Sequence, residues 1–152
     1  MIKLIEINEN NWLQAASLKV NDKQKGFLDS SLGIIARGYA FRSCNARVFG
    51  IAFDEILVGL ALVKDLDEEP ACYDLQQFMI DERYQNRGYG TQALELILTM
   101  LSKERKYGQV EVCVKNKASS ALRVYEKSGF TDTGYIDEDV PDCLNLIYRF
   151  SD

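Results

Sequence analysis

The sequence contains no histidine, and its four cysteines never form a Cys-x-x-Cys pair. Structural and catalytic zinc sites are built mainly from these two residue types, so we expect no metal site. A hydrolase that activates serine or cysteine through histidine is excluded for the same reason. The scattered cysteines are predicted to be reduced thiols of the core: Cys44, Cys72, Cys113 and Cys143.

Long apolar runs and an excess of positive charge are also missing. Because no stretch of about 18 apolar residues and no signal-peptide pattern occurs, we expect a cytoplasmic protein without membrane contact. The net charge of −5 argues against nucleic-acid binding and is compatible with a cationic substrate. The length of 152 residues, 47% of them hydrophobic, predicts a single domain over residues 1–152.

A nucleoside-triphosphate loop of the G-x-x-x-x-G-K-[ST] type is absent, but a different glycine-rich turn spans residues 85–91. It lies between a strand-like run, 75–80, and a helical run, 93–101. Free N–H groups at such a helix start, next to glycines that let a ligand approach, are typical of a phosphate site. A dinucleotide fingerprint also fits residues 88–93. However, polar residues separate its first glycine from the strand, and the rest of the chain is too short for a doubly wound sheet.

Apolar periodicity, capping residues and turn residues predict the order of the secondary-structure elements. We expect a strand, two helices, three strands, a helix, a strand, a helix and two strands. The first helix begins after Asn10 or Asn11 and the second after Ser30 or Ser31. The other elements are expected at 2–7, 47–53, 56–64, 72–80, 88–105, 109–114, 118–127, 130–136 and 143–150.

Two motifs in this order carry a family resemblance. Residues 85–91 read Q-x-x-G-x-G-T, and residues 121–130 read A-x-x-x-Y-x-x-x-G-F. Both are similar to motifs of the GCN5-related N-acetyltransferases, the GNAT superfamily. The resemblance implies an α/β (α+β) fold with a central mixed, mostly antiparallel sheet of six to seven strands and about four helices. It also implies an N-acetyltransferase that moves an acetyl group from acetyl-CoA to an amine without a metal.

The resemblance assigns the cofactor site residue by residue. The strand backbone at Phe78, Met79 and Ile80 would pair with the pantetheine arm. The glycine turn would contribute the cofactor-binding residues Gln85, Asn86, Arg87, Gly88, Tyr89, Gly90 and Thr91. The pyrophosphate would be bound by N–H groups of Arg87, Gly88, Gly90 and Thr91, and Arg83 and Arg87 would add positive charge. Many relatives carry an asparagine at the position of Ala118, and here either Asn116 or Ser119 takes its place.

Acetyl transfer requires a neutral amine, and an alkylamine with a pKa of about 10.4 is mostly protonated at neutral pH. A base must therefore remove a proton, and an acid must protonate the departing thiolate. The family pattern makes Tyr125 the acid. Asp74 is a candidate for the base, by similarity to the histone-acetylating branch. Simple strand alternation would put Asp74 on the face of Gln76, Phe78 and Ile80.

The acceptor is predicted from a narrower resemblance. Residues 77–85, together with Gln24, Phe27 and the run 57–59, look like bacterial diamine and spermine/spermidine N-acetyltransferases. The substrate-binding candidates are Gln24, Phe27 and Gln76, and the acidic loops 65–69 and 137–142 could gather around a polycation. The expected partner is thus a small amine, possibly polycationic. Another small amine, a protein N-terminus or lysine, a non-catalytic CoA-binding regulator and a homodimer all remain open.

Overall fold

The computed structural model describes residues 1–21 and 30–151, and within them the chain forms one seven-stranded sheet flanked by four α-helices. The strands lie in the order β1-β2-β3-β4-β5-β7-β6, and every neighbouring pair is antiparallel except β4 and β5. The predicted fold class is confirmed. The elements are β1 (Ile2–Glu6), α1 (Trp12–Ala16), α2 (Ser31–Ala40), β2 (Arg47–Phe53), β3 (Ile56–Leu66), β4 (Cys72–Ile80), α3 (Tyr89–Glu104), β5 (Gln109–Lys115), α4 (Ser119–Lys127), β6 (Thr131–Asp132) and β7 (Cys143–Arg149).

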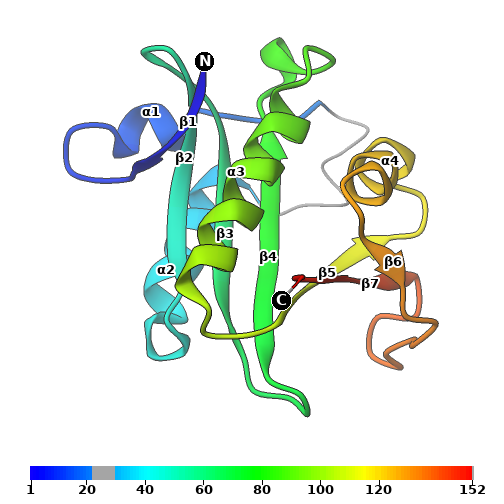
Figure 1. Cartoon of the computed structure of the whole chain (residues 1–152). Helices are drawn as coiled ribbons and strands as arrows, with labels where there is room; N and C mark the ends of the chain where they lie inside the picture. The colour runs from blue at the N-terminus through cyan, green and yellow to red at the C-terminus, as the bar shows by residue number, and fades with distance from the viewer. Residues whose placement is uncertain (22–29, 152) are drawn as a thin grey trace.

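The sheet buries a separate apolar core on each face. On one face α3 and α4 cover the sheet, with Leu94, Ile97 and Leu101 of α3 fully buried. On the other face Ala15 of α1 and Ile34 of α2 join a second core. Figure 1 shows α3 crossing in front of the central strands, with α4 beside β5 and β6. Central strand β3 contributes to both cores, which explains its almost continuous apolar sequence.

The parallel strands β4 and β5 touch only at one end. Their pairing is limited to Tyr73 with Val110 and Asp74 with Glu111. Beyond this contact the two strands diverge, and among the described residues no strand pairs with the edge of β4 that faces β5 from Leu75 to Ile80. The sheet is therefore split into an open fork (Figure 1).

A β-bulge lies in β4 where the fork opens. Leu62 pairs with Gln77 while Val63 pairs with Leu75, which leaves Gln76 as the extra residue. Before the bulge, Asp74 and Gln76 face α2. After it, Phe78 and Ile80 pack with the α3/α4 core, and Met79 packs with the α1/α2 core. The prediction that Asp74 shares a face with Phe78 and Ile80 was wrong, because the extra residue reverses the alternation.

The predicted element limits agree with the structure except at the last strand pair. Ser30 is the N-cap of α2, and its side chain accepts a hydrogen bond from Gly33 N–H at 3.0 Å. Strand β6 was predicted over 130–136 but spans only two residues, since Gly134 turns the chain with a φ of 78°. No helix within the described ranges is long and apolar enough to cross a membrane.

Candidate functional site

The fork between β4 and β5 forms a cleft of about 810 Å³. One wall is β4 from Leu75 to Ile80, and the opposite wall combines the end of β5 with the first turns of α4. The glycine turn lines the cleft at the end where β4 and β5 lie apart and α3 begins. Segments distant in the sequence thus meet around one cavity.

The glycine turn places the start of α3 against the cleft. Gly88 is the N-cap of the helix with a φ of 81°, a conformation that other residues rarely adopt. Gln92 N–H makes a 3.1 Å hydrogen bond to Gly88 carbonyl, so the N–H groups of Tyr89, Gly90 and Thr91 have no acceptor within the helix. These groups and the helix dipole suit a phosphate anion.

Gly90 leaves space for a ligand. A Cβ added at Gly90 would lie 3.7 Å from Ile80 and 3.8 Å from Phe78, which is ordinary van der Waals contact. The protein alone would therefore accept a side chain here. A larger side chain would extend into the cleft and take the place of a ligand bound beside the helix N-terminus.

The polar residues before the glycine turn hold it to the end of β4. The side-chain amide of Gln85 donates to the Ile80 carbonyl at 2.9 Å. The buried Asp81 carboxylate accepts from the N–H groups of Lys19 and Arg83 and forms an ion pair with the Arg83 guanidinium. Arg83 is thus engaged by Asp81, although the sequence had suggested that it adds charge beside a phosphate.

Tyr125 reaches the cleft from α4. The residue is 5% exposed, and the centroid of its ring lies 6.3 Å from that of Phe78 and 5.4 Å from that of Phe130. Burial raises the pKa of the Tyr125 hydroxyl above the ordinary value of a phenol. The hydroxyl is therefore protonated at neutral pH and can act as a donor.

Asp74 lies beyond the closed end of the cleft, where β4 and β5 pair, on the face of the sheet opposite Tyr125. Burial raises the pKa of its carboxyl, an effect that the neighbouring Lys64 ammonium opposes. Across the fork, burial and the nearby Glu68 and Asp74 raise the pKa of Glu111 to about 7. Gln76, two residues further along β4 and on the same face as Asp74, accepts a hydrogen bond at its Oε1 from Arg37 of α2 at 3.3 Å.

Most of the predicted site residues meet at this cleft, but three do not line it. Arg87 is not part of its wall, Asp74 lies behind Gln76, and the exposed Asn116 donates its N–H to the Asp142 carbonyl at 2.8 Å. Gln24 and Phe27 fall outside the described residues. The predicted residues that do line the cleft are Gln76, Phe78, Met79, Ile80, Gln85, Asn86, Gly88, Tyr89, Gly90, Thr91, Ser119 and Tyr125.

Sequence reasoning missed several residues of the wall. Lys117 and Arg123 bring exposed cations to the side of the cleft formed by α4, and Cys113 brings a thiol from β5. The two cations flank the start of the A-x-x-x-Y motif, which is the one signal that could have identified them. By charge alone they resemble any solvated helix terminus.

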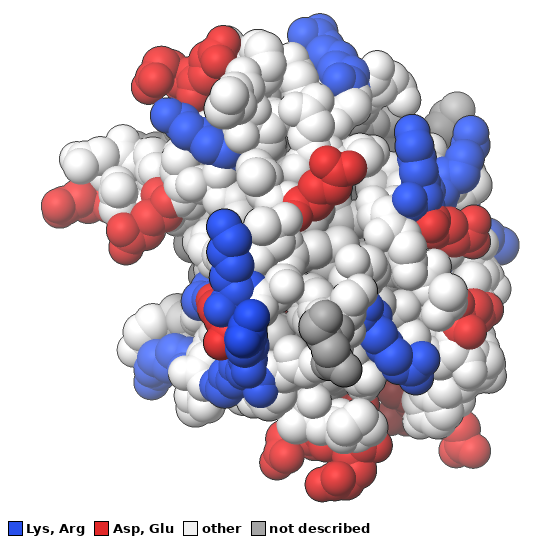
Figure 2. All heavy atoms as spheres, viewed as in Figure 1, with Lys and Arg blue, Asp and Glu red and all other residues white. Residues whose placement is uncertain are grey.

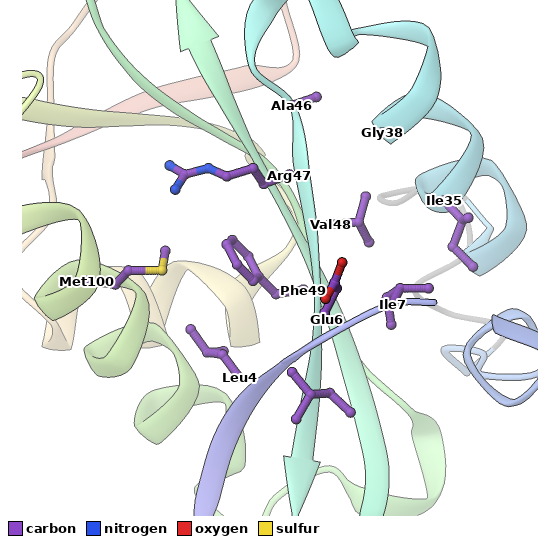
Figure 3. Close-up of a pocket in the computed structure, with 11 residues that line it drawn as sticks. Leu4, Glu6, Ile7, Ile35, Gly38, Ala46, Arg47, Val48, Phe49 and Met100 are labelled. Carbon is purple, nitrogen blue, oxygen red and sulfur yellow. The ribbon is translucent and has the colours of Figure 1, made fainter. Parts of the chain in front are cut away.

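A second hollow of about 530 Å³ lies at the outer edge of β2, beyond the end of β1. Figure 3 shows Ile7, Ile35 and Val48 on one side of the sheet and Leu4, Phe49 and Met100 on the other. Its wall is mainly aliphatic and aromatic, and the guanidinium of its Arg47 is already paired with Glu104, so the hollow is a poorer match for a phosphate than the start of α3.

The acidic loops lie outside the cleft wall, and each has acids already paired. Asp65 forms an ion pair with Lys106, and Asp142 forms one with Lys115. In Figure 2, acidic side chains gather at the lower end of the molecule, where the β3–β4 hairpin carries the exposed Asp67, Glu68 and Glu69. Only part of the predicted negative charge is therefore available to a polycation.

Comparison with known proteins agrees with this geometry. The model of the acetyltransferase (GNAT) family matches residues 10–130. A relative named spermine/spermidine N(1)-acetyltransferase, from Bacillus subtilis (strain 168), is 24% identical over 142 residues, which are 90% of this chain and 91% of the relative.

Solved structures share the fold. The spermidine N-acetyltransferase from Vibrio cholerae, in complex with CoA and spermine, has a TM-score of 0.75 at 15% identity, over 97% of this chain and 95% of that chain. An aminoglycoside acetyltransferase in complex with coenzyme A has a TM-score of 0.82 at 12% identity, over 98% of this chain and 95% of that chain.

Proposed function

The chain belongs to the acetyltransferase (GNAT) family, and from this premise we propose that it transfers the acetyl group of acetyl-CoA to a primary amine of a polyamine such as spermidine or spermine. The observation that carries the proposal is the cleft itself. It runs past the N-terminus of α3 and the buried Tyr125, and the paired residues Asp74 and Glu111 lie beyond its closed end.

The residues of the cleft fit acetyl-CoA as the co-substrate. The N–H groups of Tyr89, Gly90 and Thr91 would bind the pyrophosphate, and Lys117 and Arg123 would add positive charge on the opposite wall. The edge of β4 that has no partner strand would bind the amide-containing arm. When bound there, acetyl-CoA supplies an acetyl group activated as a thioester.

Two side chains would move the protons of the transfer. Asp74, on the α2 face, would accept a proton from the attacking amine, directly or through water. Tyr125, on the α3/α4 face, would donate its hydroxyl proton to the departing sulfur. The new N–C bond replaces the C–S bond, and the two proton transfers leave the amide and the free thiol neutral.

The polyamine assignment draws support from the name of the Bacillus subtilis relative and from the spermine in the Vibrio cholerae complex. The carboxylates of Glu68 and Glu111, which lie near each other beyond the closed end, are compatible with a cationic acceptor. The second candidate is another small amine, because an aminoglycoside acetyltransferase has a TM-score of 0.82 to this chain. We place the activity in the cytoplasm, also as a proposal.

The experiment is a thiol-release assay with acetyl-CoA across a panel of polyamines, aminoglycosides, amino acids and peptides, with the products identified by mass spectrometry. The proposal predicts acetylated spermidine or spermine at millimolar or lower amine concentration. Turnover confined to a different amine would refute the polyamine as the acceptor and leave the acetyltransferase activity standing. Absence of turnover with every amine would favour a CoA-binding regulator instead.

A further inference from the structure

Lys64 is a buried cation beside the active cleft. Its residue is 9% exposed, and its ammonium lies 3.3 Å from Asp74 Oδ2 and 5.4 Å from the centre of the Phe41 ring. Lysine is rarely buried without a partner, and a cation above an aromatic face is attracted to it. Phe41 directly follows α2, so residues from β3, β4 and the end of α2 together hold this ammonium in place.

The other groups around Asp74 are mostly acidic. Within the described parts of the chain, Lys64 is the one cation that forms an ion pair with the Asp74 carboxylate. The remaining titratable and charged groups come from the β3–β4 turn, β4, β5 and α2: Glu68, Cys72, Glu111, Cys113 and Arg37. Without Lys64, Asp74 would be a partly buried carboxylate facing two other carboxylates, which disfavours its charged form.

The position of Asp74 makes its charge relevant to the reaction. Gln76, on the same face of β4, lines the cleft, and Asp74 lies about 7 Å behind it by the rise of a strand. The side chain of Asp74 is 17% exposed, so solvent still reaches the partly buried carboxylate. It faces the α2 side of the fork, opposite the side that Tyr125 occupies.

We propose that Lys64 is a positioning residue for acetyl transfer: its ammonium keeps the Asp74 carboxylate ionised and directed towards the amine at the closed end of the cleft. The inference rests on the proposed function, in which Asp74 accepts the amine proton. Lys64 itself neither gives nor takes a proton in the reaction. Its charge makes the ionised form of Asp74 available at neutral pH.

The test is the pH profile of kcat/KM for spermidine in the wild type, Lys64→Met and Lys64→Arg. An opposite charge at this distance lowers the pKa of a carboxyl by about one to three pH units. The acidic limb of the Lys64→Met profile should therefore move upward by about one to three pH units, with activity recovered at alkaline pH. Lys64→Arg should restore the wild-type limb. Lys106→Met is the matched control, because it removes a different Lys–Asp pair, with Asp65, outside the cleft.

A purely structural role for Lys64 would lower kcat/KM by the same factor at every pH and leave the limb in place. That result, or an unchanged profile, overturns the inference.

If Lys64→Met does not fold, the same pH profile is measured on Lys64→Gln, which has a neutral hydrogen-bond donor in place of the ammonium. If the wild type acetylates another amine of the panel, that amine replaces spermidine. If it acetylates none, the proposed function fails with this inference, whereas an active wild type with an unmoved limb refutes the role of Lys64 alone.

Discussion

The ring of Tyr125 on α4 lies 6.3 Å from the ring of Phe78 on β4, at a tilt of 57°. This contact joins the two walls of the cleft beyond the point where β4 and β5 cease to pair. It depends on the bulge at Gln76, because without the extra residue Phe78 would point to the α2 face. The same bulge leaves Asp74 on the face opposite Tyr125, so the proposed acid and base lie on two sides of one cleft.

Removal of the Tyr125 hydroxyl should separate a catalytic role from a packing role. In Tyr125→Phe the ring keeps its contacts with Phe78 and Phe130, and only the proton donor is lost. We expect single-turnover acetyl transfer to fall by roughly 10²–10⁴-fold, the usual size of a general-acid effect. Acetyl-CoA affinity should change little. An unchanged single-turnover rate would remove Tyr125 from the mechanism, and a loss of about 1–3 kcal/mol in the free energy of unfolding beside that unchanged rate would assign the hydroxyl a structural role.

Ser119 and Asn116 can be distinguished by their effect on cofactor affinity. Both residues are exposed, but Ser119 begins α4 and lines the cleft, whereas Asn116 does not line it. If the Ser119 hydroxyl contacts the cofactor, Ser119→Ala should weaken acetyl-CoA binding by roughly 2- to 12-fold, the equivalent of about 0.5–1.5 kcal/mol for one hydrogen bond. Asn116→Ala should bind as the wild type does. Calorimetry that shows the reverse order would assign the contact to Asn116.

The carboxyl of Glu111 should make stability depend on pH. Its pKa of about 7 in the folded chain exceeds the ordinary value of 4.5, so the folded state binds its proton more tightly than the unfolded state. Stability should therefore fall as pH rises from about 4.5 to about 7.

Glu111→Gln removes this effect of pH. With a discount for partial solvent screening, the variant should be more stable than the wild type by about 1–2 kcal/mol at pH 8 and show no gain below pH 4.5. Urea denaturation at both pH values measures this, and an equal difference at the two would refute the assignment.

The order of elements, and the residues of the glycine turn and Tyr125 that meet at the cleft, could be predicted from the sequence, because motif spacing and apolar periodicity are local signals. The bulge at Gln76 could not, since residues 75–77 contain no glycine or other mark of an extra residue and its position is set by pairing with β3. The ion pair of Lys64 with Asp74 could not be predicted from the sequence for the same reason. It requires knowledge of which β3 residue lies opposite Asp74.

The most direct test of the account is calorimetric titration of acetyl-CoA into the wild type, Gly90→Val and Gly108→Val. A side chain at Gly90 would extend into the cleft beside Phe78 and Ile80, while Gly108 has no atom within 4 Å of an added Cβ and lies outside the cleft. If the helix start binds the pyrophosphate, Gly90→Val should lose measurable binding and still melt cooperatively, and Gly108→Val should bind as the wild type does. Unchanged acetyl-CoA affinity in a folded Gly90→Val protein would contradict the account.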